Sequence, residues 1–173
     1  MKKLLLGLLC TIALGAYANP ADDLLNRIDK GAAAKFKTIL VKSDKDFFEI
    51  DQTGNGKNTT APKPAGKNNP IIIRGNSWVN IAVGINWYLK HHAGIHITWN
   101  NMSPKLPNVL PAVKQKERHE TDLKLRYDFN YCTFSYTMAF WDWNRWQKEI
   151  DWMALHGINM PLAAVGTECV WRN

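Results

Sequence analysis

Two polar segments near the carboxyl-terminal end of the chain hold side chains suited to binding a sugar. Asn130 and Tyr136 begin and end the first segment, and Glu168 ends the second, 165–168. An amide both donates and accepts hydrogen bonds with hydroxyl groups, and a carboxylate accepts them. Aromatic faces pack against a pyranose ring, and this region supplies Tyr131, Phe134, Tyr136 and Trp141. These residue types predict a carbohydrate-binding site.

The same residues also have structural explanations. The aromatic cluster is equally typical of a packed loop, because aromatic side chains carry large burial energies wherever they lie. Glu168 fits equally well at the start of a helix, where the helix dipole favours a carboxylate. Retaining glycosidases need two carboxyl groups about 5 to 5.5 Å apart, one to attack and one to protonate the leaving oxygen. We find no such pair in the sequence and assign no catalytic residue.

Other titratable side chains are predicted to be structural. Asp142 fits a helix cap, and Glu149 and Asp151 fall on the predicted outer face of that helix, which points away from the sugar-binding loops. The histidines show no metal-ligand spacing with one another or with the cysteines. They are His91, His92, His96, His119 and His156. The sequence therefore predicts neither a protein metal site nor a cofactor.

The sequence around the two loops predicts the start of a parallel α/β unit. The pattern predicts a strand over 124–129, a helix from the cap Asp142 to a stop at Gly157, and a nearly continuous apolar strand over 158–164. The apolar face of the helix is predicted to consist of Trp143, Trp146, Ile150, Met153 and Ala154. Strand, helix and strand make a right-handed βαβ unit, and its active-site loops follow the carboxyl ends of the strands.

The preceding part of the chain predicts a separate small α/β domain. We expect a helix over 21–34, strands over 37–41 and 46–51 joined as a hairpin, a surface loop over 52–69 and a strand over 71–74. A helix capped by Ser77 follows from residue 78 to a stop at Gly94, and 95–99 alternates as a half-buried strand. Prolines and then charged residues mark the domain boundary after it. The predicted domains are 19–112 and 113–173.

The amino terminus predicts export. Lys2 and Lys3 precede the apolar run 4–14 and the small-residue segment 16–18, which are the parts of a secretory signal peptide over 1–18. The apolar run has about 11 residues, well short of the roughly 20 that span a bilayer. We therefore expect no stable membrane insertion after cleavage, and a secreted or periplasmic protein.

Charge and cysteine content narrow the function further. The processed chain would carry 20 basic and 15 acidic side chains, a formal charge of +5 spread along the sequence. Nucleic-acid binding needs a concentrated basic patch, so we predict no nucleic-acid partner. Cys132 and Cys169 remain after processing, and an oxidising compartment permits a disulfide between them. We expect free thiols, because two cysteines do not make a disulfide scaffold.

Taken together, these segments resemble the alpha-N-acetylglucosaminidase family of glycoside hydrolases. The resemblance is carried by 130–136 (Asn-Tyr-Cys-Thr-Phe-Ser-Tyr), 141–146 (Trp-Asp-Trp-Asn-Arg-Trp), 149–159 and 166–168 with Trp171. It implies a small α/β domain, a (β/α)8 TIM barrel and an all-helical carboxyl-terminal domain. It also implies an exo-acting enzyme that removes terminal α-linked N-acetylglucosamine from a glycan with retention of configuration.

Matched residue by residue, the resemblance makes Asn130, Cys132 and Glu168 substrate-binding candidates, to which the aromatic cluster adds Tyr136. The family's two catalytic glutamates come from later strands of the barrel. This chain holds about one and a half strand–helix units, whereas a complete barrel needs roughly 250 residues. We therefore expect an amino-terminal fragment that is inactive alone: a small α/β domain, then the first strands and helix of a truncated TIM barrel. The alternative is a secreted, non-catalytic carbohydrate-binding or interaction module, which exposed strand edges disfavour.

Overall fold

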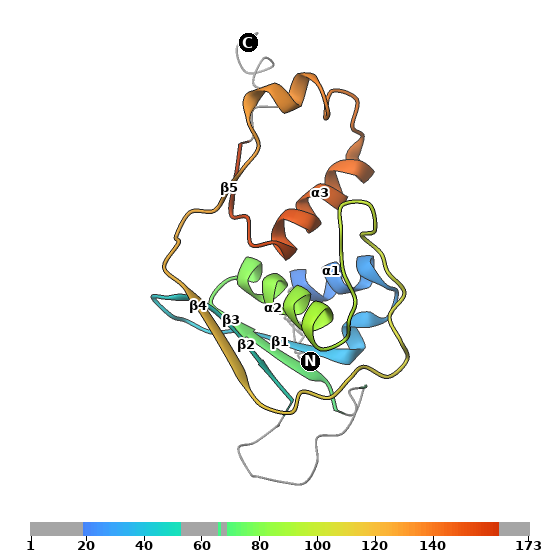
Figure 1. The fold of residues 1–173 in the computed structure, drawn as a ribbon, viewed down its shortest axis with the longest axis vertical. Coiled ribbons are helices and arrows are strands. Elements are labelled where there is room, and N and C mark those ends of the chain that lie inside the picture. Colours follow the sequence, from blue (N-terminus) through green and yellow to red (C-terminus); the bar gives the residue numbers. More distant parts are fainter. Residues whose placement is uncertain (1–18, 53–65, 67–68, 163–173) are drawn as a thin grey trace, which may run out of the picture.

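The computed structural model describes residues 19–52, 66 and 69–162 (Figure 1). The predicted signal peptide, most of the predicted 52–69 loop, Glu168 and Cys169 lie outside these residues. The described chain forms a mixed α/β unit with a four-stranded sheet, followed by a smaller segment with a two-stranded sheet. In the part of the chain that the structure describes, no helix has the length and apolar character needed to cross a membrane.

The larger sheet is mixed, and its third strand in sequence lies inside it. The strands are β1 (Phe36–Leu40), β2 (Asp46–Asp51), β3 (Ile71–Gly75) and β4 (Glu117–Thr121), in the spatial order β1-β3-β2-β4. β1 runs parallel to β3, whereas β2 is antiparallel to both β3 and β4. An inner strand is covered on both edges, which fits the fully buried Ile71 and Ile73 of β3.

Two predictions for this sheet are wrong. The predicted hairpin does not form, because β3 lies between β1 and β2 and pairs with both. Segment 95–99 is not a strand and makes only an isolated bridge between Thr98 and Asn101. The fourth strand is instead β4, within the charged segment after the prolines. β4 is an edge strand, and charged side chains are common on such edges because they face water. Its Arg118 reaches Glu49 of β2 at 2.7 Å.

The first helix is shorter than predicted. α1 (Pro20–Ile28) begins at the cap Asn19, whose side-chain oxygen accepts the Ala21 N–H at 3.0 Å. The chain then turns through Gly31, which has a left-handed φ of 86°, into a short 3-10 helix, η1 (Ala32–Lys35). The predicted helical run of 21–34 is therefore divided in two.

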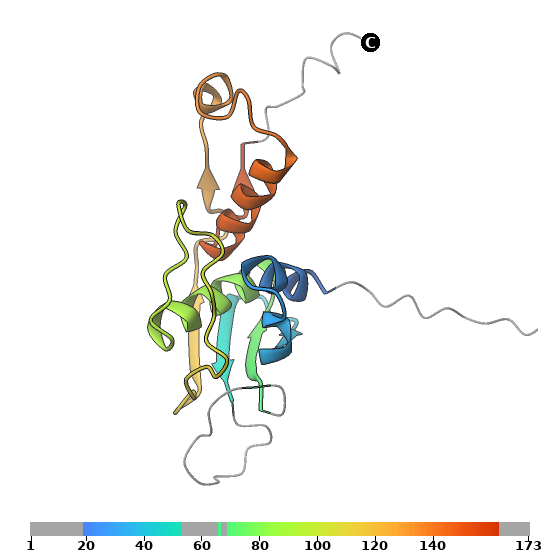
Figure 2. The same cartoon turned by 90° about the vertical axis from the view of Figure 1, so that its right-hand side faces the viewer.

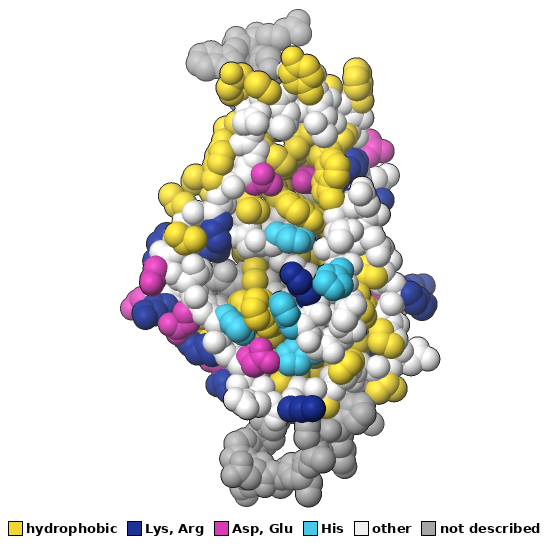
Figure 3. Space-filling model, in the orientation of Figure 1, with side chains coloured by type: hydrophobic (Ala, Val, Ile, Leu, Met, Phe, Trp, Pro, Cys, Tyr) yellow, Lys and Arg dark blue, Asp and Glu magenta, His cyan; other side chains and the backbone are white. Residues whose placement is uncertain are grey.

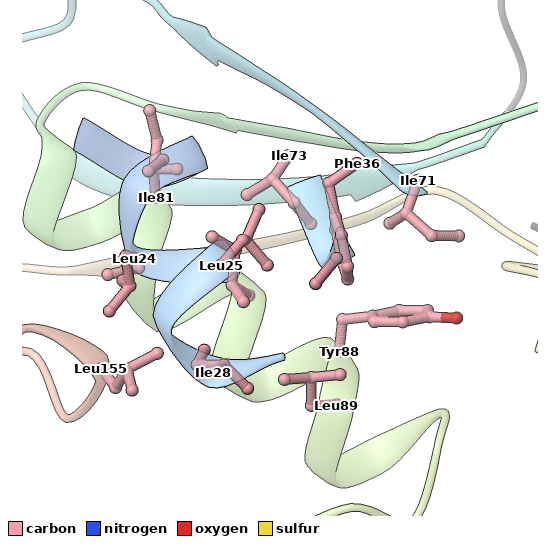
Figure 4. Packing of buried hydrophobic residues seen from close by; sticks show 14 of the residues in the cluster. Leu24, Leu25, Ile28, Phe36, Ile71, Ile73, Ile81, Tyr88, Leu89 and Leu155 are labelled. Carbon is pink, nitrogen blue, oxygen red and sulfur yellow. The ribbon is translucent and has the colours of Figure 1, made fainter. Parts of the chain in front are cut away.

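The second helix, α2 (Trp78–His91), begins at the predicted cap, because the Ser77 hydroxyl accepts the Asn80 N–H at 3.1 Å. α2 crosses the sheet closely at Gly84, where a Cβ atom would lie 2.8 Å from Ile73 Cγ2. α1 and α2 lie on the same face of the sheet (Figures 1 and 2). Between helices and sheet lies one apolar core, part of which is drawn in Figure 4; its labelled members include Leu25, Ile73, Ile81, Tyr88 and Leu89.

The second segment consists of two short strands, a 3-10 helix and one longer α-helix. Its elements are β5 (Tyr127–Asp128), η2 (Tyr131–Ser135), α3 (Trp143–Leu155) and β6 (Met160–Pro161). β5 and β6 pair in parallel, so the predicted βαβ order is present, although both strands are shorter than predicted. α3 begins at the predicted cap Asp142 and stops before Gly157, whose φ is 82°. Leu155, at its end, enters the core of the first unit (Figure 4).

The face that α3 buries differs from the prediction. Glu149 and Asp151, expected on the outer face, are only 3% and 9% exposed. Trp143 and Ile150, expected in the core, are 66% and 45% exposed. The buried carboxylates are tolerated because each has a charged partner, which offsets the cost of removing a charge from water. α3 therefore turns its acidic face toward the first unit.

Candidate functional site

The candidate sugar-binding segment is held by Asn130 at the carboxyl end of β5. The Asn130 side-chain oxygen accepts the Cys132 N–H at 2.9 Å and so caps η2. The Thr133 hydroxyl donates to the Asn130 carbonyl oxygen at 2.7 Å. With its oxygen engaged in this cap, the Asn130 amide keeps its NH2 group for another acceptor.

The other predicted site residues in this segment lie on its surface. Cys132 is exposed, and Tyr136, directly after η2, is 79% exposed. Hydrophobic side chains are plentiful on this upper part of the molecule in Figure 3. Glu168 and Cys169 lie outside the described residues, so the role of Glu168 and the state of the two thiols remain predictions.

The backbone just before the segment is strained. Phe129 has a φ of 73°, the only positive value among the described non-glycine residues. Its N–H is accepted by the Asp128 carboxylate at 2.8 Å. A bulky residue in the left-handed region is uncommon, and such strain gathers at functional sites because the surrounding structure must hold it. No pattern in the sequence marks this residue.

A continuous series of aromatic contacts runs from this strained turn to the first unit. Phe129 meets Phe134 of η2 with ring centroids 6.2 Å apart, and Phe134 meets Trp146 of α3 at 6.2 Å. Trp146 meets Trp141 at 5.1 Å, and Trp141 meets Trp99 at 6.3 Å. All four separations fall within the range for favourable aromatic pairs. Phe134 of this segment is thus packed against α3, whereas Tyr131 and Tyr136 are 78% and 79% exposed.

The last ring of the series is fixed by a buried carboxylate that the sequence analysis missed. Glu149 accepts the indole N–H of Trp99 at 2.5 Å and a guanidinium N–H of Arg145 at 2.9 Å. The Arg145 guanidinium lies over both Trp99 and Trp141, 4.7 and 3.9 Å from their ring centroids. The i, i+4 spacing of Arg145 and Glu149 predicts that the two side chains pair. Nothing in the sequence predicts that they lie beside Trp99.

A second polar junction joins the two units at Arg126, just before β5. Its guanidinium donates to the Asp46 carboxylate at 2.9 Å, to the Leu123 carbonyl at 2.6 Å, to the Asn80 side-chain oxygen at 3.3 Å and to the Gly157 carbonyl. Hydrogen bonds from Asn76 and from Arg126 hold the pKa of Asp46 below its ordinary value. Arg126 therefore ties β2 and α2 to the turn that follows α3.

A cluster of histidines lies on the first unit, on the face seen in Figure 3. Glu117 of β4 lies 2.9 Å from His92 and 3.3 Å from His119, and its carboxylate accepts the Trp87 indole N–H at 3.3 Å. Burial raises the pKa of Glu117, but the hydrogen bond to His119 and the nearby His92 outweigh it and leave the pKa lowered. Over 19–52 and 69–162, no three histidine, cysteine or acidic residues are arranged to hold a metal ion.

Two hollows among the described residues lie away from the sugar-binding segment. One of about 400 Å³ lies between α1, residues 102–103 and α3, with Arg27, Gln147 and Asp151 in its wall. Another of about 210 Å³ lies at the Arg126 junction. We keep the candidate site at 130–136, because the carboxyl ends of strands, not helix flanks, carry the active sites of barrel enzymes.

The described fold is similar to that of solved family 89 glycoside hydrolases. A family 89 glycoside hydrolase from Clostridium perfringens, solved in complex with its substrate GlcNAc-alpha-1,4-galactose, superposes with a TM-score of 0.76 at 31% identity. That match covers 89% of this chain and 16% of the other. A structure of the family 89 enzyme from the same organism in complex with PUGNAc gives a TM-score of 0.73 at 32% identity, with the same coverage.

The family follows from the sequence models. The alpha-N-acetylglucosaminidase amino-terminal domain matches residues 19–112, and the alpha-N-acetylglucosaminidase TIM-barrel domain matches residues 126–173. The chain belongs to the alpha-N-acetylglucosaminidase family, and the predicted resemblance is confirmed. Human alpha-N-acetylglucosaminidase is 44% identical over 102 residues, which are 59% of this chain and 14% of the human protein. The chain thus spans about a seventh of that relative.

Proposed function

We propose that this chain forms the small α/β domain and the start of the barrel of an exo-acting alpha-N-acetylglucosaminidase. The enzyme would remove terminal α-linked N-acetylglucosamine with retention, and its two catalytic glutamates would come from strands of the barrel other than β5 and β6. The observation that carries the proposal is the match of residues 126–173 to the family's barrel domain, together with a similar enzyme solved with GlcNAc-alpha-1,4-galactose. Export through a signal peptide over 1–18 is part of the same proposal.

In this proposal the segment 130–136 contributes to the pocket for the terminal sugar. The Asn130 NH2 group donates to a hydroxyl or acetamido oxygen, while its oxygen keeps η2 capped. Cys132 and Tyr136 line the same pocket, and Glu168 accepts from a sugar hydroxyl. Retention follows from the paired-carboxylate mechanism, in which one carboxylate forms a glycosyl-enzyme intermediate that water then hydrolyses.

The test uses the full-length gene product and 4-nitrophenyl N-acetyl-α-glucosaminide. Release of 4-nitrophenol is expected from the α-linked substrate and not from its β-linked counterpart. Proton NMR of the first product formed is expected to detect the α-anomer, as retention requires. The absence of hydrolysis, or a first product in the β-configuration, would overturn the proposal.

Two variants at one position test the pocket. Asn130→Asp keeps an oxygen that caps η2 but replaces the NH2 donor by a charged carboxylate oxygen, whereas Asn130→Ala removes both the cap and the donor. Loss of a hydrogen bond to a sugar is expected to lower kcat/KM at least ~10-fold in both variants. If Asn130→Asp retains wild-type kcat/KM, Asn130 acts only as a cap and not in sugar binding.

A further inference from the structure

Glu149 of α3 and Trp99 of the first unit form a hydrogen bond that joins the two units and fixes the Trp99 side chain. The Glu149 carboxylate is 3% exposed, whereas Trp99 is 47% exposed. The indole of Trp99 is nevertheless held in one orientation, because its N–H donates to Glu149 and its ring lies over Arg145. A half-exposed tryptophan gains less from burial than a core one, so these directional contacts set its position.

The contact is connected to the sugar-binding segment. Arg145, held by Glu149, lies 3.9 Å from the ring centroid of Trp141, which is the residue just before the cap of α3. Trp141 packs on Trp146, and Trp146 packs on Phe134 inside η2. The aromatic series therefore places η2 relative to a loop of the first unit.

We propose that Glu149 and Trp99 are positioning residues for the sugar-binding segment 130–136, acting through Arg145 and Trp141. This inference rests on the proposed function, since it assigns the first unit a part in sugar binding by the barrel. Neither residue touches the sugar. Loosening either one lets η2 shift, which moves the groups proposed to hydrogen-bond the sugar away from their partners, and a hydrogen bond weakens steeply as its geometry worsens.

Two substitutions break the contact with little change in shape. Trp99→Phe removes the indole N–H and keeps an aromatic ring beside Arg145. Glu149→Gln removes the charge that holds Arg145. The matched controls are Trp78→Phe, a 39% exposed tryptophan at the start of α2, and Glu120→Gln, a surface carboxylate of β4.

Kinetics of the full-length gene product separate positioning from a structural role. Assays are run well below the melting temperature of each variant. If the segment binds the sugar equally in ground and transition states, KM rises about 5-fold or more while kcat stays within about 2-fold. The double variant is expected to be no worse than the poorer single one, because both act on one contact. Both controls are expected to match wild type.

Deuterium labelling of the Cys132 amide provides a readout that needs no activity, because this N–H donates to the Asn130 side chain at the start of η2. Hydrogen exchange is followed by mass spectrometry of the peptide that carries η2. A loosened η2 is expected to raise the Cys132 labelling rate at least ~3-fold in Trp99→Phe and Glu149→Gln, and not in the controls.

The outcomes separate the two proposals. An active wild type with unchanged KM and unchanged Cys132 labelling in both variants overturns the positioning role and leaves the proposed function standing. An inactive wild type overturns the proposed function, and the labelling rates alone then decide whether Trp99 and Glu149 position η2. A lower melting temperature with wild-type KM and labelling means that the contact is only structural.

Discussion

Replacing Arg126 by methionine is expected to lower the free energy of unfolding by about 3 kcal/mol. Its side chain is 16% exposed, as is that of its partner Asp46, and their atoms are 2.9 Å apart. Removing one member of a buried ion pair costs about 3 to 5 kcal/mol, because the other charge is left without compensation. The pair keeps some contact with water, so we take the lower end. Asn80 and the Gly157 carbonyl also lose their donor.

The measurement is urea unfolding of the purified chain, followed by tryptophan fluorescence and by circular dichroism. Arg126→Lys keeps the charge but not the planar fork, and is expected to cost about 1 to 2 kcal/mol. A double-mutant cycle with Asp46→Asn is expected to give a coupling of about 1 to 2 kcal/mol. Lys105→Met is the control and should barely move the unfolding midpoint, because the Lys105 side chain is 88% exposed and its ammonium lies 4.0 Å from Asp29.

Acid provides a second test of the same pair. The pKa of Asp46 is lowered in the folded chain, first by Asn76 and then by Arg126. A lowered folded pKa contributes stability above the unfolded value, near 3.8, and that contribution disappears as pH falls through the folded value. The gap between wild type and Arg126→Met should therefore narrow below about pH 4. A gap under about 0.5 kcal/mol at pH 7 would refute the reasoning.

Three further perturbations follow from the packing. Leu155→Ala empties a fully buried site and should cost about 2 to 5 kcal/mol in urea unfolding. Gly84→Ala places a methyl 2.8 Å from Ile73 Cγ2, so overpacking of about 1 to 3 kcal/mol should exceed the gain in helix propensity. Burial raises the pKa of Glu49, but Lys116 and Arg118 outweigh it and lower the pKa. Thermal melts should therefore show stability lost as pH falls below about 4.5, and a weaker loss in Glu49→Gln.

Much of the fold was readable from local patterns. Ser77 and Asp142 are strong caps, and the structure begins a helix after each. The isoleucines of β3 predicted a strand, since β-branched runs favour extended backbone. The periodicity of apolar residues, however, does not show which strands become neighbours. The position of β3 between β1 and β2 could therefore not be predicted. The alternation of apolar and polar residues over 95–99 predicted a strand wrongly, because alternation does not show whether a partner strand lies beside the segment.

The candidate site was partly readable. The resemblance pointed to Asn130 and Cys132, and the structure adds that Asn130 caps η2. Phe129, with its positive φ, lies at the junction of β5 and η2, and no residue type in the sequence predicts this conformation. Glu149 was assigned to the outer face because the helical periodicity placed the apolar residues on the opposite, core-facing side. Only the three-dimensional meeting of α3 with Trp99 makes its burial favourable.

The strand order of the first sheet also constrains the synthesis of the chain. β2 is made early, but the partner for its outer edge, β4, lies 66 residues beyond the end of β2. At about 5 to 20 residues per second, translation leaves that edge uncovered for roughly 3 to 13 seconds. An open edge is a template for pairing with other chains. Ribosome-bound chains arrested before residue 117 should therefore be more prone to aggregation and proteolysis than chains arrested after β4 has left the ribosome.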